Sequence, residues 1–129
     1  MKANSNIIPM QNGIVKAGEY SYTRRSRSIT AYGETFELPV KTVEFGDKLD
    51  EVREEIAGQT RTSDTIRFLK KGIALFIGSE AVEKIYPEKK LMELEVDEVL
   101  GFWTALNFEF NRNQNEMLAR YTAAKAIRR

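Results

Sequence analysis

The sequence predicts a mainly α fold of the α+β class, in which an N-terminal β-hairpin is followed by a small bundle of about four helices. Hydrophobic residues alternate at period two within residues 26–40, as in a hairpin. In four later stretches they recur every three or four residues, as in amphipathic helices. The chain has 129 residues, of which 42% are hydrophobic, and this suits one domain around one core.

The chain divides by composition into three parts. Residues 1–25 mix Asn, Ser, Gly and Pro with isolated hydrophobic residues, so we expect a flexible N-terminal arm with one short strand near residues 13–16. This arm either stays disordered or becomes ordered on a neighbouring molecule. Residues 26–124 are expected to form a single globular domain, and residues 125–129 a basic C-terminal tail.

The hairpin is expected to turn at Gly33, which can supply the positive φ that a tight turn needs. Pro39 closes the second strand or confines it to a sheet edge. Because a two-stranded hairpin is marginal by itself, it must lie on the helices or pair with another subunit. The alternating apolar residues of the two strands are Ile29, Ala31, Phe36, Leu38 and Val40.

The first two helices are expected on either side of Gly58. This glycine suits the end of the first helix, while Thr62 or Ser63, helped by Asp64, suits the start of the second. Lys70 of the second helix is expected to face solvent, together with Arg67 and Lys71. The two apolar faces comprise Thr42, Phe45, Leu49, Val52 and Ile56, and then Ile66, Leu69, Ile73, Phe76 and Ile77.

A short third helix is expected between Gly78, which ends the second helix, and Pro87, which stops the third. Ser79 is its expected N-cap. Its inward residues are expected to be Val82, Ile85 and Tyr86, and residues 88–95 are expected to link it to the last helix.

The longest helical pattern runs from Val96 to Tyr121 and holds the only tryptophan of the chain; Asp97 is its expected N-cap. Gly101 and Ala105 lie to one side of the apolar stripe, where their small size would let a second helix approach closely. The segment is either the core helix of the bundle or a core helix that also offers a face to a partner. The apolar stripe comprises Val99, Trp103, Leu106, Phe110, Met117 and Tyr121.

The composition argues against catalysis. The chain has no cysteine and no histidine, which excludes disulfides, thiol catalysis and Cys-based zinc sites, and removes the usual general base. A cluster at Glu51, Glu54 and Glu55 is interpreted as a solvated helix face, since nothing else in the sequence completes a metal or acid–base site. We expect no enzymatic activity, no cofactor and no metal. No apolar run reaches the length of a membrane span or a signal peptide, so we expect neither membrane insertion nor secretion.

Charge is distributed unevenly along the chain. Residues 1–30 carry a net charge of +4 and residues 119–129 another +4, whereas residues 31–118 carry −7. An acidic body with basic ends argues against a broad nucleic-acid-binding face on the domain. Arg24, Arg25 and Arg27 with the basic tail nevertheless leave a nucleic-acid-binding or packaging accessory protein as an alternative.

Four segments in this order resemble the tail assembly chaperones of long-tailed, siphovirus-type phages and prophages of Gram-positive bacteria. The similarity covers roughly residues 29–121 and is one of pattern and order. The segments are ITAYGETFELPVKT, FGDKLDEV, IALFIGSEAVEKIYPEK and DEVLGFWTALNFEFNRNQNE.

The resemblance implies a non-enzymatic protein of the host bacterial cytoplasm that binds the tape measure protein and keeps it soluble before tail-tube polymerisation. It also implies a homo-oligomer. A minor structural tail or connector protein remains an alternative. The residues that we expect to form or border the partner-binding surface are Phe76, Ile77, Phe102, Trp103, Leu106 and Phe110.

Overall fold

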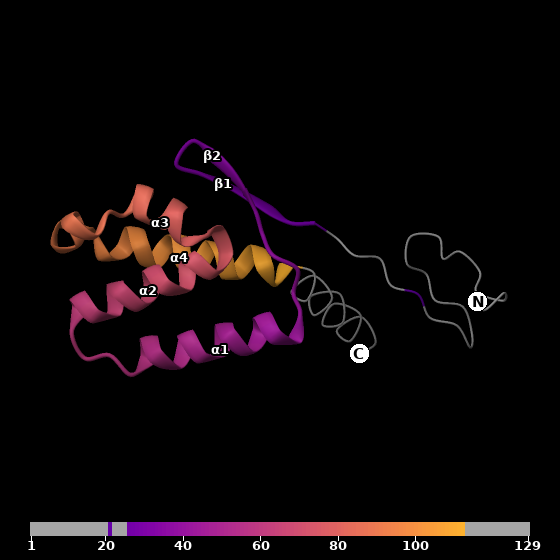
Figure 1. Ribbon diagram of the computed structural model, residues 1–129, viewed down its shortest axis with the longest axis horizontal. Helices are drawn as coiled ribbons and strands as arrows, with labels where there is room; N and C mark the ends of the chain where they lie inside the picture. The colour runs from indigo at the N-terminus through magenta and orange to yellow at the C-terminus, as the bar shows by residue number, and fades with distance from the viewer. Residues whose placement is uncertain (1–20, 22–25, 113–129) are drawn as a thin grey trace, which may run out of the picture.

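The computed structural model describes residue 21 and residues 26–112, and these form a β-hairpin beside a helical bundle (Figure 1). The mainly α fold with an N-terminal hairpin is therefore confirmed. Nearly all of the expected N-terminal arm, the C-terminal tail and the last helix beyond residue 112 lie outside the described residues, so those expectations stay predictions.

The hairpin consists of β1 (Ser28–Ala31) and β2 (Glu34–Glu37), which pair antiparallel with Ala31 opposite Glu34. This register leaves a two-residue turn. Both turn residues have positive φ, 54° at Tyr32 and 78° at Gly33, as a type I′ turn requires. The prediction of a turn at Gly33 is confirmed, and the left-handed conformation of Tyr32 is unusual for a residue with a side chain.

The first helix, α1 (Val43–Ala57), ends before Gly58 as predicted, but Thr42, which was expected on its apolar face, is its N-cap. The Thr42 hydroxyl accepts a hydrogen bond from the backbone N–H of Phe45, and Gly58 follows as the C-cap. The second helix, α2 (Thr62–Ile77), differs from the prediction at its start, because Arg61 is the N-cap and makes no side-chain capping bond. Thr62 is already the first helical residue, so the backbone N–H groups there are left without the expected hydroxyl partner.

Two further helical segments precede the last helix. Gly78, with φ of 94°, ends α2 and also forms the N-cap of α3 (Ser79–Ile85), so Ser79 lies inside the helix and does not cap it. Residues 88–95 are not a plain linker, because they contain a 3₁₀-helix, η2 (Glu88–Glu93), that buries Leu91. The last helix, α4 (Val96–Phe110), has Glu95 as its N-cap, which places Asp97 in the first turn.

The core forms around α2, which packs against α1, α3 and α4 (Figure 1). Residues from all four α-helices and η2 contribute to one continuous cluster, so residues 26–112 share a single hydrophobic core. None of the described helices has both the length and the apolar character needed to cross a bilayer. The buried cluster comprises Leu49, Ile66, Leu69, Ile73, Phe76, Val82, Tyr86, Leu91, Val99, Phe102, Leu106 and Phe110.

The prediction that Lys70 faces solvent is wrong. Its side chain is only 9% exposed, and its ammonium reaches two carboxylates, Glu88 at 3.3 Å and Glu83 at 3.8 Å. The long aliphatic stem is buried while the charged end stays at the surface between α2, α3 and η2. The hydrogen bond from Lys70 is the main cause that lowers the pKa of Glu88.

The hairpin lies on the helices through its turn. The Tyr32 ring makes edge-to-face contacts with Tyr86 and Phe102, at centroid distances of 5.8 and 5.4 Å. Its hydroxyl donates to the Glu98 carboxylate at 2.8 Å and lies 2.6 Å from the Tyr86 hydroxyl. Burial is the main cause that raises the pKa of both tyrosines. An ion pair of 3.1 Å between Lys84 and Glu34 adds a second link.

Replacing Tyr32 by phenylalanine is expected to lower the free energy of unfolding by about 1–2 kcal/mol, because the Tyr86 hydroxyl loses its partner in a buried position. The ring and the turn conformation are retained, so the change isolates the hydroxyl. The measurement is chemical denaturation of both proteins. The double variant with Tyr86→Phe should lose little more than Tyr32→Phe alone, and strictly additive losses would contradict a shared hydrogen bond.

Candidate partner-binding site

The six residues expected to contact a partner lie mostly in the core. Phe76, Phe102, Leu106 and Phe110 are buried, and Ile77 and Trp103 are partly buried. Phe76 contacts both Trp103 and Phe110, with ring centroids 6.0 and 5.3 Å apart. In this conformation these side chains hold α2 and α4 together, so a partner would have to meet other residues first. Their contact with a partner stays a prediction.

The large apolar side chains that solvent reaches are a different set. Val43 is 84% exposed, although it begins α1, and Phe108 is 63% exposed on α4. The sequence contained a signal for Val43, since it falls between the apolar stripe positions Thr42 and Phe45 and so lies off that stripe. The remaining exposed large apolar residues are Tyr32, Val40, Met92, Val96 and Leu100.

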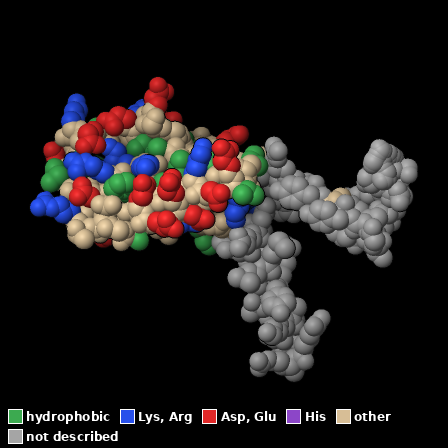
Figure 2. All heavy atoms as spheres, turned by 60° about the horizontal axis from the view of Figure 1, so that its bottom comes forward, with side chains coloured by type: hydrophobic (Ala, Val, Ile, Leu, Met, Phe, Trp, Pro, Cys, Tyr) green, Lys and Arg blue, Asp and Glu red, His purple; other side chains and the backbone are tan. Residues whose placement is uncertain are grey.

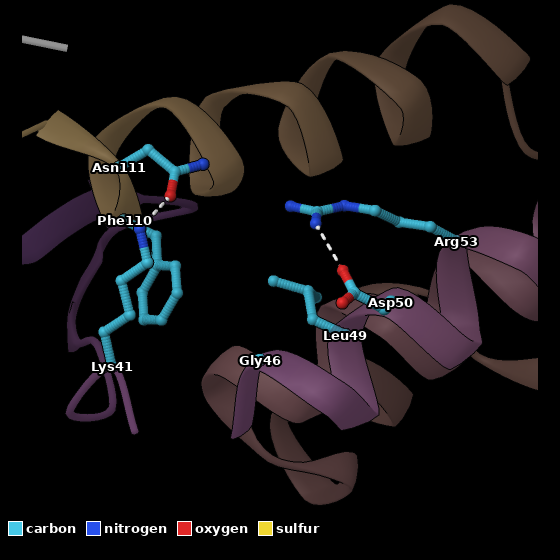
Figure 3. A pocket seen from close by; sticks show the side chains of 7 residues that line it. All are labelled: Lys41, Gly46, Leu49, Asp50, Arg53, Phe110 and Asn111. Atoms are coloured by element: carbon cyan, nitrogen blue, oxygen red, sulfur yellow. Dashed lines mark hydrogen bonds and ion pairs between the residues drawn. The ribbon is translucent and has the colours of Figure 1, made fainter. Parts of the chain in front are cut away.

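An open hollow lies between the start of α1 and the end of α4 (Figure 3). We call it the α1–α4 hollow; its volume is about 410 Å³. It lies at the end of the bundle where residue 112, the last described residue, follows α4 (Figure 1). The hollow is lined by Lys41, Gly46, Leu49, Asp50, Arg53, Phe110 and Asn111.

Two apolar side chains reach the floor of the α1–α4 hollow, although most of its exposed lining is polar. Leu49 and Phe110 are both buried members of the core that reach its lining. Gly46 keeps the wall open, because a Cβ built there would meet no atom within 4 Å. Val43 is not part of the lining, but it precedes Gly46 by three residues on α1, about one helical turn, and its side chain is exposed.

The rim of the α1–α4 hollow is polar and already partly paired. The Lys41 ammonium donates to the Asn111 side-chain oxygen at 2.7 Å and lies 5.6 Å from the centroid of the Phe110 ring. Arg53 forms an ion pair of 3.2 Å with Asp50 and donates to the side-chain oxygen of Asn107 at 2.6 Å. Two cations and one carboxylate around an apolar floor suit an amphipathic segment that carries acidic groups.

The described residues offer no site for a metal ion made of three or more His, Cys, Asp or Glu side chains. In the carboxylate cluster of α1, Glu51 and Glu54 are exposed, and Glu55 forms an ion pair of 3.0 Å with Lys71. On the face shown in Figure 2, basic and acidic side chains are intermixed. A surface of this kind has no single-sign stripe to follow a phosphate backbone.

Neither protein-family models, nor curated proteins, nor solved structures match this chain. The choice of function therefore depends on the surfaces of the molecule and on the resemblance of pattern in residues 29–121.

Proposed function

We propose that this chain is a phage tail assembly chaperone, which binds the tape measure protein and keeps it soluble until the tail tube polymerises around it. The observation that supports the proposal is the α1–α4 hollow, where two core side chains, Leu49 and Phe110, lie within a polar rim about one helical turn from the exposed Val43. The resemblance in residues 29–121 supplies the identity of the partner. We place this activity in the cytoplasm of the host bacterium.

A chaperone of this kind must hold its client and later release it. The α1–α4 hollow would bury the apolar face of a client helix on Leu49 and Phe110, while the rim cations meet acidic groups of the client. Within the chain, Arg53 pairs with Asp50 and Lys41 with Asn111, and these pairs can form again when the client leaves. Breaking the ion pair and the hydrogen bond of the rim costs free energy, and only the free energy gained beyond this cost contributes to binding. The contact with the client is therefore moderate in affinity and reversible.

The experiment is co-expression of the full chain with the tape measure protein encoded beside it, followed by affinity capture and mass measurement of the soluble complex. Val43→Asp is expected to lower capture strongly, because it places a carboxylate about one helical turn from the lining of the hollow. The fold should be retained, since the site is 84% exposed and an acidic residue suits the first turn of a helix.

Met92→Asp is the matched control. Met92 is 82% exposed, and its segment, η2, lies at the other end of the bundle (Figure 1). Like Val43→Asp, this variant replaces an exposed apolar side chain by a carboxylate, and it should capture as much tape measure protein as the wild type. Equal capture by the wild type and Val43→Asp would exclude the α1–α4 hollow as the client site. If the wild type leaves the tape measure protein insoluble and instead retains nucleic acid with a steep salt dependence, the chaperone function itself fails and the nucleic-acid alternative replaces it.

A further inference from the structure

The outer face of α4 lies opposite the core, is largely apolar, and is left exposed by residues 26–112. Two turns of this face carry Leu100, which is 45% exposed, and Phe108, which is 63% exposed. Between them, Gly101 and Ala105 are exposed, and a Cβ built on Gly101 meets no atom within 4 Å. We define the outer face by Asp97, Leu100, Gly101, Thr104, Ala105 and Phe108, and Arg112 follows Phe108 by about one helical turn.

The order of residues on this face is self-complementary. If two copies of α4 lie antiparallel with a two-fold axis at the midpoint between Thr104 and Ala105, positions at equal distances from the midpoint face each other. Gly101 then lies opposite Phe108 of the second copy. Farther from the two-fold axis, Asp97 lies opposite Arg112 of the second copy. The same alignment thus places each aromatic ring over a glycine and each carboxylate beside a guanidinium.

We propose that the outer face of α4 binds a second copy of this chain as an antiparallel, two-fold symmetric helix pair. Small residues at Gly101 and Ala105 allow the two helix backbones to approach closely, so that the Phe108 rings can be buried in the gaps. A Cβ at position 101 would occupy the space that the ring of the second copy needs.

Charge selects the antiparallel direction. In a parallel pair, Asp97 would face Asp97, Arg112 would face Arg112, and the helix dipoles would be aligned; each of these contacts is repulsive. In the antiparallel pair, both ends of the interface carry opposite charges. The guanidinium of Arg112 already pairs with Glu109 of its own chain at 3.4 Å, and its several N–H donors allow a carboxylate from the second copy to bind as well.

The experiment is sedimentation of the purified full chain, without any client, from low-micromolar to submillimolar concentration. The wild type is expected to pass from monomer to dimer. Gly101→Gln fills the gap on the outer face and is expected to weaken dimerisation by about tenfold or more. Its melting temperature at dilute concentration should be unchanged or raised, because glutamine is a better helix former than glycine and nothing in the described structure crowds the site.

A charge reversal tests the alignment. D97R alone and R112D alone are each expected to dimerise more weakly than the wild type, because each places like charges at both ends of its own homodimer. An equimolar mixture of D97R and R112D should form a heterodimer in which both ion pairs are restored. This outcome is specific to the pairing of position 97 with position 112 and would not follow from a general loss of stability.

Two results would overturn the proposal. One is a wild type that stays monomeric at submillimolar concentration. The other is a variant that does not behave as the alignment predicts. Either Gly101→Gln dimerises to the same extent as the wild type, or the mixture of D97R and R112D forms no heterodimer. Neither result depends on the chaperone function, because no client is present.

Discussion

Replacing Leu106 by alanine is expected to lower the free energy of unfolding by about 2–5 kcal/mol. Leu106 has no solvent-exposed surface and lies in the core cluster on the side of α4 that faces α2. The change removes buried methyl groups and leaves a cavity that rigid neighbours fill only in part. Because leucine and alanine have similar helix propensities, the loss reports packing and not helix formation. The measurement is urea denaturation at dilute protein concentration.

Leu100→Ala on the same helix is the matched control. Its side chain is 45% exposed, so we expect a change within about 0.5 kcal/mol in the dilute monomer. The same pair of variants also separates the two surfaces of α4: Leu106→Ala weakens the fold, whereas Leu100→Ala acts on association. Equal losses of stability at the two positions would contradict the placement of the core on one side of this helix.

Replacing Gly72 by alanine is expected to destabilise the protein although alanine favours helices. A Cβ at Gly72 would lie 2.5 and 2.8 Å from two ring carbons of Trp103, and 3.0 Å from a methyl group of Val52. Overpacking of this kind costs about 1–3 kcal/mol, which offsets or exceeds the gain of about 1 kcal/mol from helix propensity. Gly101→Ala on α4 has open space and should instead stabilise the dilute monomer by about 0.5–1 kcal/mol.

A double-variant cycle tests the cause of the Gly72 effect. Trp103→Phe removes the part of the ring that the new Cβ would strike, so Gly72→Ala should cost less in that background than in the wild type, with a coupling of about 0.5–3 kcal/mol. The measurement is the free energy of unfolding of the four proteins. Additive effects would show that Trp103 does not restrict this position.

The packing of Trp103 on Gly72 also decides how partner binding can be tested. A polar residue at Trp103 would open the contact between α2 and α4, so a loss of client binding in such a variant would not separate binding from folding. Better positions are Gly46, which lines the α1–α4 hollow, and Val43, about one helical turn before it, because neither belongs to the core cluster. The apolar side chains that are buried in the core are therefore the least informative ones to mutate when the question is binding.

The sequence by itself determined the hairpin, the four α-helices and some of their ends, whereas it missed η2 and the N-caps of α2, α3 and α4. A turn that needs positive φ at Gly33 and helix ends at Gly58 and Gly78 are local requirements, and each was found where the residue pattern placed it. Spacing of three and four residues likewise located the helices, since amphipathic periodicity depends only on the helix itself.

Only the tertiary structure decided which apolar residues are buried and which remain available to a partner. On α4, apolar residues occur on every side, so Leu106 and Leu100 cannot be told apart until α2 and β1 are placed against it. Lys70 is buried because Glu83 and Glu88 come to it from other segments. Tyr32 holds the hairpin because Tyr86 and Glu98, far along the chain, meet its hydroxyl. Burial is a relation between distant segments, and a local pattern specifies a face without specifying what will cover it.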